Sequence, residues 1–142
     1  MFERLGGSEI REIAARWFDH PEPATGEEYR RRCIPYYNPS KPDPDVVARA
    51  KFREDVGLHF WGDEIRKFDL FPEVGLIRCP TLILSGELDP ITTVADHEVL
   101  AAAIPGSRLV IIEGAGHGVF RDKQDEALAA ISGFIRQGIH AN

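Results

Sequence analysis

The chain has 142 residues, of which 43% are hydrophobic and 28% are charged, a balance typical of a globular domain rather than of a disordered or fibrous chain. Its 17 Lys and Arg against 23 Asp and Glu give a net charge of −6, which argues against a nucleic-acid or membrane-surface partner. No stretch approaches the roughly 20 apolar residues of a membrane span, and the N-terminus lacks a signal-peptide pattern, so we expect a cytoplasmic protein.

The two cysteines, Cys33 and Cys79, are expected to be buried free thiols. They show no C-x-x-C spacing and have no pair of histidines nearby, so the sequence predicts neither a disulfide framework nor a zinc site.

The first half of the chain is predicted to be helical. From Ser8, apolar residues recur every three or four positions as far as Trp17, which predicts an amphipathic helix. A capping-box pattern predicts a second helix over 25–33. After a proline-rich loop, an Asp-Pro pair at 43–44 predicts a helix that runs toward Gly57, and residues 60–65 fit one more short helix.

The second half changes character. Apolar runs at 81–84 and 108–112 predict two strands buried in a parallel sheet, and each is followed by a predicted helix, one opened by a capping box at 93–96 and one ending at Gly138. Strand, helix, strand, helix is a parallel βαβα unit. Because two strands alone leave unpaired edges, we expect part of the sheet to come from elsewhere.

A carboxylate and an imidazole follow these two strands. Asp89 lies on the loop after the first strand, and His117 lies in a glycine-rich turn after the second. Because neighbouring parallel strands lie roughly 5 Å apart, we expect the two side chains to meet. An Asp–His pair of this kind is suited to proton transfer near neutral pH.

Both motifs resemble those of α/β-hydrolases. Residues 77–89, Ile-Arg-Cys-Pro-Thr-Leu-Ile-Leu-Ser-Gly-Glu-Leu-Asp, resemble the penultimate strand and acid loop of that superfamily, and 114–117, Gly-Ala-Gly-His, resemble its histidine loop. The acid precedes the histidine by 28 residues (117 − 89), which is room for one helix and one strand. The helical first half is similar to the cap of the proline-iminopeptidase-like branch.

The resemblance implies an α/β fold with two parts. Residues 1–70 correspond to a helical cap-like segment, and 71–142 correspond to the last two strands and flanking helices of the hydrolase core. It also implies that Asp89 orients His117, and that His117 acts as general base toward a serine and then as general acid toward the leaving group.

No nucleophile is expected in this chain. The family places it in G-x-S-x-G, and none of the five serines has both glycines: Ser8, Ser40, Ser85, Ser107 and Ser132. Cys33 and Cys79 lack them too. In the family the nucleophile lies N-terminal to the cap, so we expect the parent protein to be a serine hydrolase whose nucleophile half is absent here, and the chain alone to be inactive.

Substrate specificity departs from the proline iminopeptidases. In that branch a glutamate directly after the catalytic aspartate binds the substrate's free amine, whereas this chain has Pro90, which carries no charge. The spacing does not select a replacement among Glu27, Glu28, Glu64 and Glu87. Hydrolysis of an ester or an amide therefore remains the expectation, with a small molecule or a peptide as the substrate of the complete enzyme.

No cofactor and no metal is expected. The remaining histidines are expected at the surface or the edge of the core: His20, His59, His97 and His140. For the chain itself we expect either pairing with the absent N-terminal half or self-association through the exposed sheet edge. The competing hypothesis is a noncatalytic interaction module that uses the same edge.

Overall fold

The computed structural model describes residues 1–139, and the chain divides into two compact units. One unit comprises residues 1–36 and 41–69, and the other comprises 37–40 and 70 onward. The short stretch 37–40 lies within the helical half of the sequence but belongs to the second unit.

The first unit consists of helices: α1 (Phe2–Asp19), α2 (Pro23–Arg32), α3 (Pro44–Arg49) and α4 (Glu54–Gly62), with 3-10 turns η1 (Ile34–Tyr36) and η2 (Glu64–Arg66). Helices α1 and α2 pack on each other around buried aromatic side chains, and the rings of Trp17 and Tyr29 stack with their centroids 5.9 Å apart. The apolar stripe predicted from Ser8 is indeed the buried face of α1: Ile10, Ile13, Ala14 and Trp17.

Helix ends in this unit differ from the sequence prediction. Helix α1 begins at Phe2 rather than near Ser8, and Gly7, with a φ of 84°, forms a kink between its first turn and the rest of the helix. Helix α2 begins at Pro23, and Thr25 is its third residue, whose hydroxyl accepts from the Glu22 N–H at 3.0 Å.

The third helix begins where the sequence predicted, but it is shorter than predicted. Asp43 caps α3 by accepting from the Asp45 N–H at 2.8 Å. The helix stops at Arg49 instead of running to Gly57, and a second helix, α4, begins at Glu54. Neither helix has a buried residue, so side-chain burial does little to sustain a longer helix.

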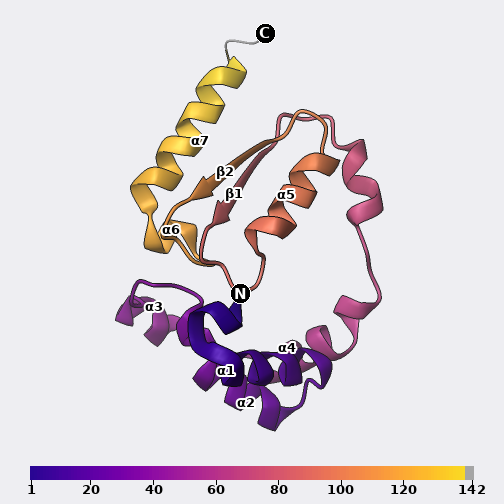
Figure 1. Ribbon diagram of the computed structural model, residues 1–142, viewed down its shortest axis with the longest axis vertical. Coiled ribbons are helices and arrows are strands. Elements are labelled where there is room, and N and C mark those ends of the chain that lie inside the picture. The colour runs from indigo at the N-terminus through magenta and orange to yellow at the C-terminus, as the bar shows by residue number, and fades with distance from the viewer. Residues whose placement is uncertain (140–142) are drawn as a thin grey trace. The chain divides into compact units, whose positions relative to one another are not determined.

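The second unit contains the predicted βαβα order and confirms the α/β fold class. Strands β1 (Leu82–Gly86) and β2 (Arg108–Ile112) pair in parallel, with Leu82 opposite Arg108 and Gly86 opposite Ile112. Helix α5 (Val94–Ala103) connects them, and η3 (Phe71–Leu76), α6 (Val119–Asp122) and α7 (Gln124–Ile139) complete the unit. Helices α5 and α7 contact both strands and lie on opposite sides of them (Figure 1).

The strands are less buried than predicted. In β1 the side chains of Ile83 and Ser85 are buried, whereas in β2 only Ile112 is, and Ile111 is 44% exposed. In the described sheet each strand pairs on one side only, so part of each strand remains open. Cys79 was also predicted to be buried and is exposed, because it lies in the loop before β1, while Cys33 is buried as expected.

None of the helices within residues 1–139 combines the length and hydrophobicity needed to cross a bilayer.

Candidate functional site

Asp89 is held in a tight turn at the carboxyl end of β1. Its N–H donates to the Gly86 carbonyl at 3.2 Å, and its Oδ1 accepts from the N–H groups of Ile91 (2.8 Å) and Thr92 (3.1 Å). Its Oδ2 accepts from the Thr92 hydroxyl at 2.8 Å, and the residue is only 3% exposed. Together, the three hydrogen bonds to Oδ1 and Oδ2 fix the carboxylate in one orientation.

These contacts also decide the charge of Asp89. Burial by itself raises the pKa of this carboxyl group, but the hydrogen bonds from the Ile91 N–H, the His117 ring and the Thr92 hydroxyl outweigh it and lower the pKa below its ordinary value. Asp89 is therefore an ionised acceptor at neutral pH.

His117 lies on the loop after β2 and meets Asp89. The loop turns at Gly114, whose φ of 68° is in the left-handed region. His117 Nδ1 lies 2.9 Å from Asp89 Oδ2, so the contact expected from the sequence is present. Because an ionised carboxylate only accepts, Nδ1 carries the proton and Nε2 is the free base of the neutral ring.

The imidazole remains open to solvent. Its side chain is 44% exposed while the carboxylate that it contacts is 4% exposed. Within residues 1–139, no hydrogen bond reaches His117 Nε2. An imidazole with a buried carboxylate at one nitrogen and an accessible lone pair on the other is arranged as a general base.

Hydrogen bonds connect the loop that carries Asp89 to the loop that carries His117. The Glu87 carboxylate accepts from the Gly114 N–H at 2.9 Å, and the Leu88 N–H donates to the Ala115 carbonyl at 2.8 Å. A Cβ at Gly86 would lie 2.0 Å from the Gly116 carbonyl oxygen, so only glycine fits there. The Asp89–His117 distance thus depends on two loops that pack directly against each other.

The structure adds residues that sequence reasoning did not single out. Asn38 and Asp122 accept from the N–H groups of Gly118 and Gly116, on either side of His117. Asp122 follows His117 by only five residues, so its proximity was open to inference. Asn38 lies 80 residues before Gly118, and no local pattern indicates that contact.

The hydroxyl groups of the serines make no contact with His117 in the described part of the chain. Ser85 is fully buried in β1 and lies 2.9 Å from His97 Nδ1, which places His97 at the edge of the core. Ser107 donates to the Ala101 carbonyl, and Ser40 bonds Asp122. Ser8 and Ser132 are exposed on helices. His140 lies outside the described residues.

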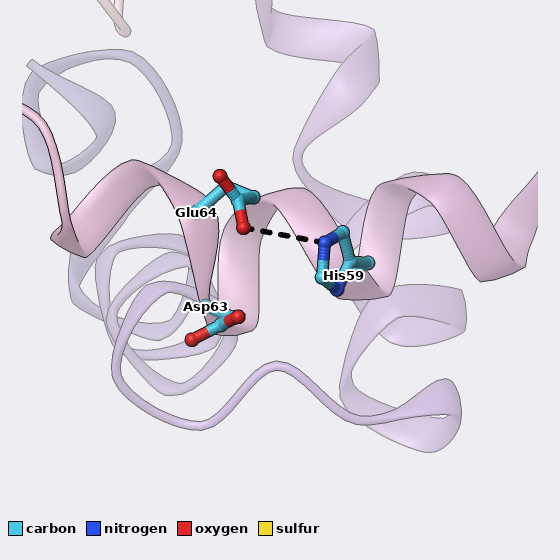
Figure 2. A group of neighbouring side chains, drawn as sticks. All are labelled: His59, Asp63 and Glu64. Carbon is cyan, nitrogen blue, oxygen red and sulfur yellow. Dashed lines mark ion pairs between the residues drawn. The ribbon is translucent and has the colours of Figure 1, made fainter.

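A cluster of possible metal ligands lies in the first unit, at the junction of α4 and η2. The ligand atoms of His59, Asp63 and Glu64 lie within 4.8 Å of one another (Figure 2). Lys67 Nζ contacts the Asp63 carboxylate and lies 3.7 Å from Glu64 Oε1, and His59 Nε2 lies 3.4 Å from the same oxygen. The Lys67 ammonium group therefore already pairs with both carboxylates of this cluster.

Solved structures share this fold. An α/β fold family hydrolase from Bacillus anthracis matches 89% of the chain with a TM-score of 0.62 and 16% identity. A thermophilic esterase from Thermogutta terrifontis matches 91% with a TM-score of 0.62 and 23% identity. The chain covers 47% and 49% of these proteins, about half their length.

Curated relatives match over shorter stretches. A proline iminopeptidase from Thermoplasma volcanium is 34% identical over 76 residues, which is 53% of this chain and 25% of that protein. A polyketide synthase, ThaQ, from Burkholderia thailandensis is 33% identical over 79 residues, 56% of this chain and 4% of that protein. A monoacylglycerol lipase from Xenopus laevis is 29% identical over 73 residues, 51% of this chain and 22% of that protein.

The family model that describes TAP-like proteins of the α/β-hydrolase superfamily matches residues 69–141. This range includes both strands, Asp89 and His117, and it amounts to half of the chain. The chain therefore belongs to the TAP-like family of α/β-hydrolases.

Proposed function

We propose that Asp89 and His117 are the acid and the histidine of a serine-hydrolase triad whose nucleophile comes from outside residues 1–142. The observation that carries the proposal is the 2.9 Å contact between His117 Nδ1 and a buried carboxylate, with Nε2 left open. Asp89 holds the ring in the Nδ1-protonated tautomer and stabilises the imidazolium, and His117 Nε2 takes the proton of the attacking hydroxyl.

The proposed reaction is hydrolysis of an ester or an amide in a small molecule or a peptide. The chain covers a quarter or less of the peptidase and lipase that it resembles, so their names select no substrate. Pro90 follows Asp89 and is buried, so this position offers no carboxylate to a substrate amine. We therefore favour an uncharged acyl group over a free amino terminus.

We infer that residues 1–70 form the cap of this hydrolase and that 71–142 form the end of its core. Two observations support this division: the first unit consists of helices, and the match to the esterase fold extends over 91% of the chain.

The chain alone is expected to be inactive. It should hydrolyse aryl esters and proline anilides no faster than its own His117→Ala variant, and a serine-directed phosphonate should leave it unlabelled. Phosphonate labelling of any serine in the isolated chain would overturn the assignment of the nucleophile to another segment.

The positive test supplies the nucleophile. Residues 1–142 are joined to, or mixed with, the G-x-S-x-G segment of a related α/β-hydrolase, and phosphonate labelling of its serine is followed with time. His117→Ala and Asp89→Asn are expected to slow labelling by about 10³-fold or more, by analogy with other triads. His59→Ala, which removes an exposed histidine outside the site, is the control. Equal labelling of all variants would refute the proposal.

The competing proposal is a noncatalytic module that associates through its sheet. The observation in its favour is that the described sheet has two strands, so each strand has one edge without a strand partner. A homogeneous dimer in size-exclusion chromatography, with native circular dichroism, would favour this module. A well-folded monomer would show that the sheet edges do not associate, and would count against this module.

A further inference from the structure

The stretch Tyr37–Ser40, here called the clamp, lies against residues 116–118 of the loop that carries His117. Three successive N–H groups of this loop donate to three acceptors outside it. Gly116 donates to Asp122 Oδ2 at 2.8 Å, His117 donates to the Tyr37 carbonyl at 2.7 Å, and Gly118 donates to Asn38 Oδ1 at 2.6 Å. Because these N–H groups lie outside the sheet and its ladder of hydrogen bonds, the three bonds help to fix the path of the loop.

The clamp approaches closely at both glycines that flank His117. A Cβ at Gly116 would lie 2.0 Å from the Tyr37 carbonyl oxygen, and a Cβ at Gly118 would lie 2.8 Å from Asn38 Oδ1. The Tyr37 ring also meets the imidazole edge to face, with centroids 5.4 Å apart at 78°. The clamp therefore contacts both the backbone and the ring of His117.

Asp122 connects the clamp to the loop. While its Oδ2 accepts from Gly116, its Oδ1 accepts from the Ser40 N–H at 3.2 Å and from the Ser40 hydroxyl. Arg121 adds a bond from its Nε to Ser40 Oγ at 3.1 Å. One carboxylate thus holds the two segments at a fixed separation.

We propose that Asn38 and Asp122 are positioning residues for His117: they fix the histidine loop so that Nδ1 faces Asp89 and Nε2 faces the reacting hydroxyl. The proposal rests on the proposed function. Asp89 restrains only one ring atom, whereas the placement of Nε2 depends on the backbone that carries the ring. An error of about 1 Å in such a placement costs about 100-fold in rate.

The test measures the ring directly in the isolated chain. Nuclear magnetic resonance gives the solvent-exchange rate of the His117 Nδ1 proton, a signal that depends on the Asp89 contact. Asn38→Ala is expected to raise this rate, and the exchange rate of the Gly118 N–H, about tenfold. Asn38→Asp keeps an acceptor oxygen and is expected to restore both rates. Asp125→Asn, an exposed change at the start of α7, is the control.

A second variant covers the case in which Asn38→Ala does not fold. Asp122→Asn retains the volume of the side chain but replaces one of the two acceptor oxygens with an NH2 donor, so that either Gly116 N–H or Ser40 N–H loses its acceptor. This variant is likewise expected to raise the Nδ1 exchange rate. Circular dichroism verifies the fold of each variant. A folded variant whose Nδ1 proton exchanges at the wild-type rate would overturn the proposal.

The reconstituted hydrolase gives a reading that a purely structural role would not change. Asn38→Ala is expected to lower kcat about tenfold and to leave KM within about twofold, because the ring is misplaced while substrate contacts persist. If activity does not depend on His117 at all, the proposed function fails, while the exchange measurements still decide the positioning.

Discussion

Gly116→Ala tests whether the clamp holds the histidine loop as closely as the structure indicates. The added Cβ would lie 2.0 Å from the Tyr37 carbonyl oxygen, and real Cβ contacts essentially never fall below 3.0 Å, so the oxygen must retreat by about 1.0 Å. That movement stretches the 2.7 Å bond from the His117 N–H beyond hydrogen-bond distance.

The magnitude follows from these two effects. Overpacking against a backbone atom costs about 1–3 kcal/mol, and the lost hydrogen bond costs about 0.5–1.5 kcal/mol. We expect Gly116→Ala to lower the free energy of unfolding by about 1.5–4.5 kcal/mol. Urea denaturation followed by circular dichroism measures this difference.

Gly133→Ala is the matched control. Gly133 lies within α7, and a Cβ there meets no atom within 4 Å, so the same substitution should stabilise the chain by about 0.4–1 kcal/mol. A Gly116→Ala protein within about 0.5 kcal/mol of wild type would refute the close contact between the Tyr37 carbonyl and the histidine loop.

Three further predictions follow from single contacts. Because the pKa of Asp89 is lowered in the folded state, its charged form stabilises the fold above the unfolded pKa of about 3.9. The difference in free energy of unfolding between wild type and Asp89→Asn, measured by urea denaturation between pH 7 and 3, should therefore shrink as the pH falls below about 4. A difference that stays constant over this range would contradict the prediction. Thr93→Ala removes the cap of α5 and should cost about 1 kcal/mol in the same assay; an unchanged value would show that the cap is dispensable. Iodoacetamide at pH 8 should modify exposed Cys79 and spare buried Cys33, whose pKa is raised by burial to about 11. Mass spectrometry after digestion measures both modifications, and faster modification of Cys33 would contradict the prediction.

Local sequence signals predicted the second unit well. Short apolar runs marked β1 and β2, and the Thr93 capping box marked the start of α5, because each signal lies within a few residues of the structure that it specifies. The order strand, helix, strand also brought Asp89 and His117 to one edge of the sheet, since parallel strands end on the same side. The 2.9 Å contact between them was open to prediction for this reason.

Other features depended on packing. The α3 segment was predicted to continue toward Gly57, but propensity does not sustain a helix that buries no side chain. Strand β2 was predicted to be buried, yet the exposure of Ile111 depends on how many strands and helices surround it. The same holds for Cys79, whose apolar neighbours in the sequence do not cover it.

The sequence by itself determined the strands, the βαβα order and the two residues that can share a proton, because periodicity, caps and strand ends are local or follow from topology. Only the tertiary structure decided what holds the histidine in place. Asn38 reaches Gly118 across 80 residues, and Ser40 reaches Asp122 across 82. A contact over such a separation leaves no periodic pattern in the chain, since it exists only when folding brings two distant segments together.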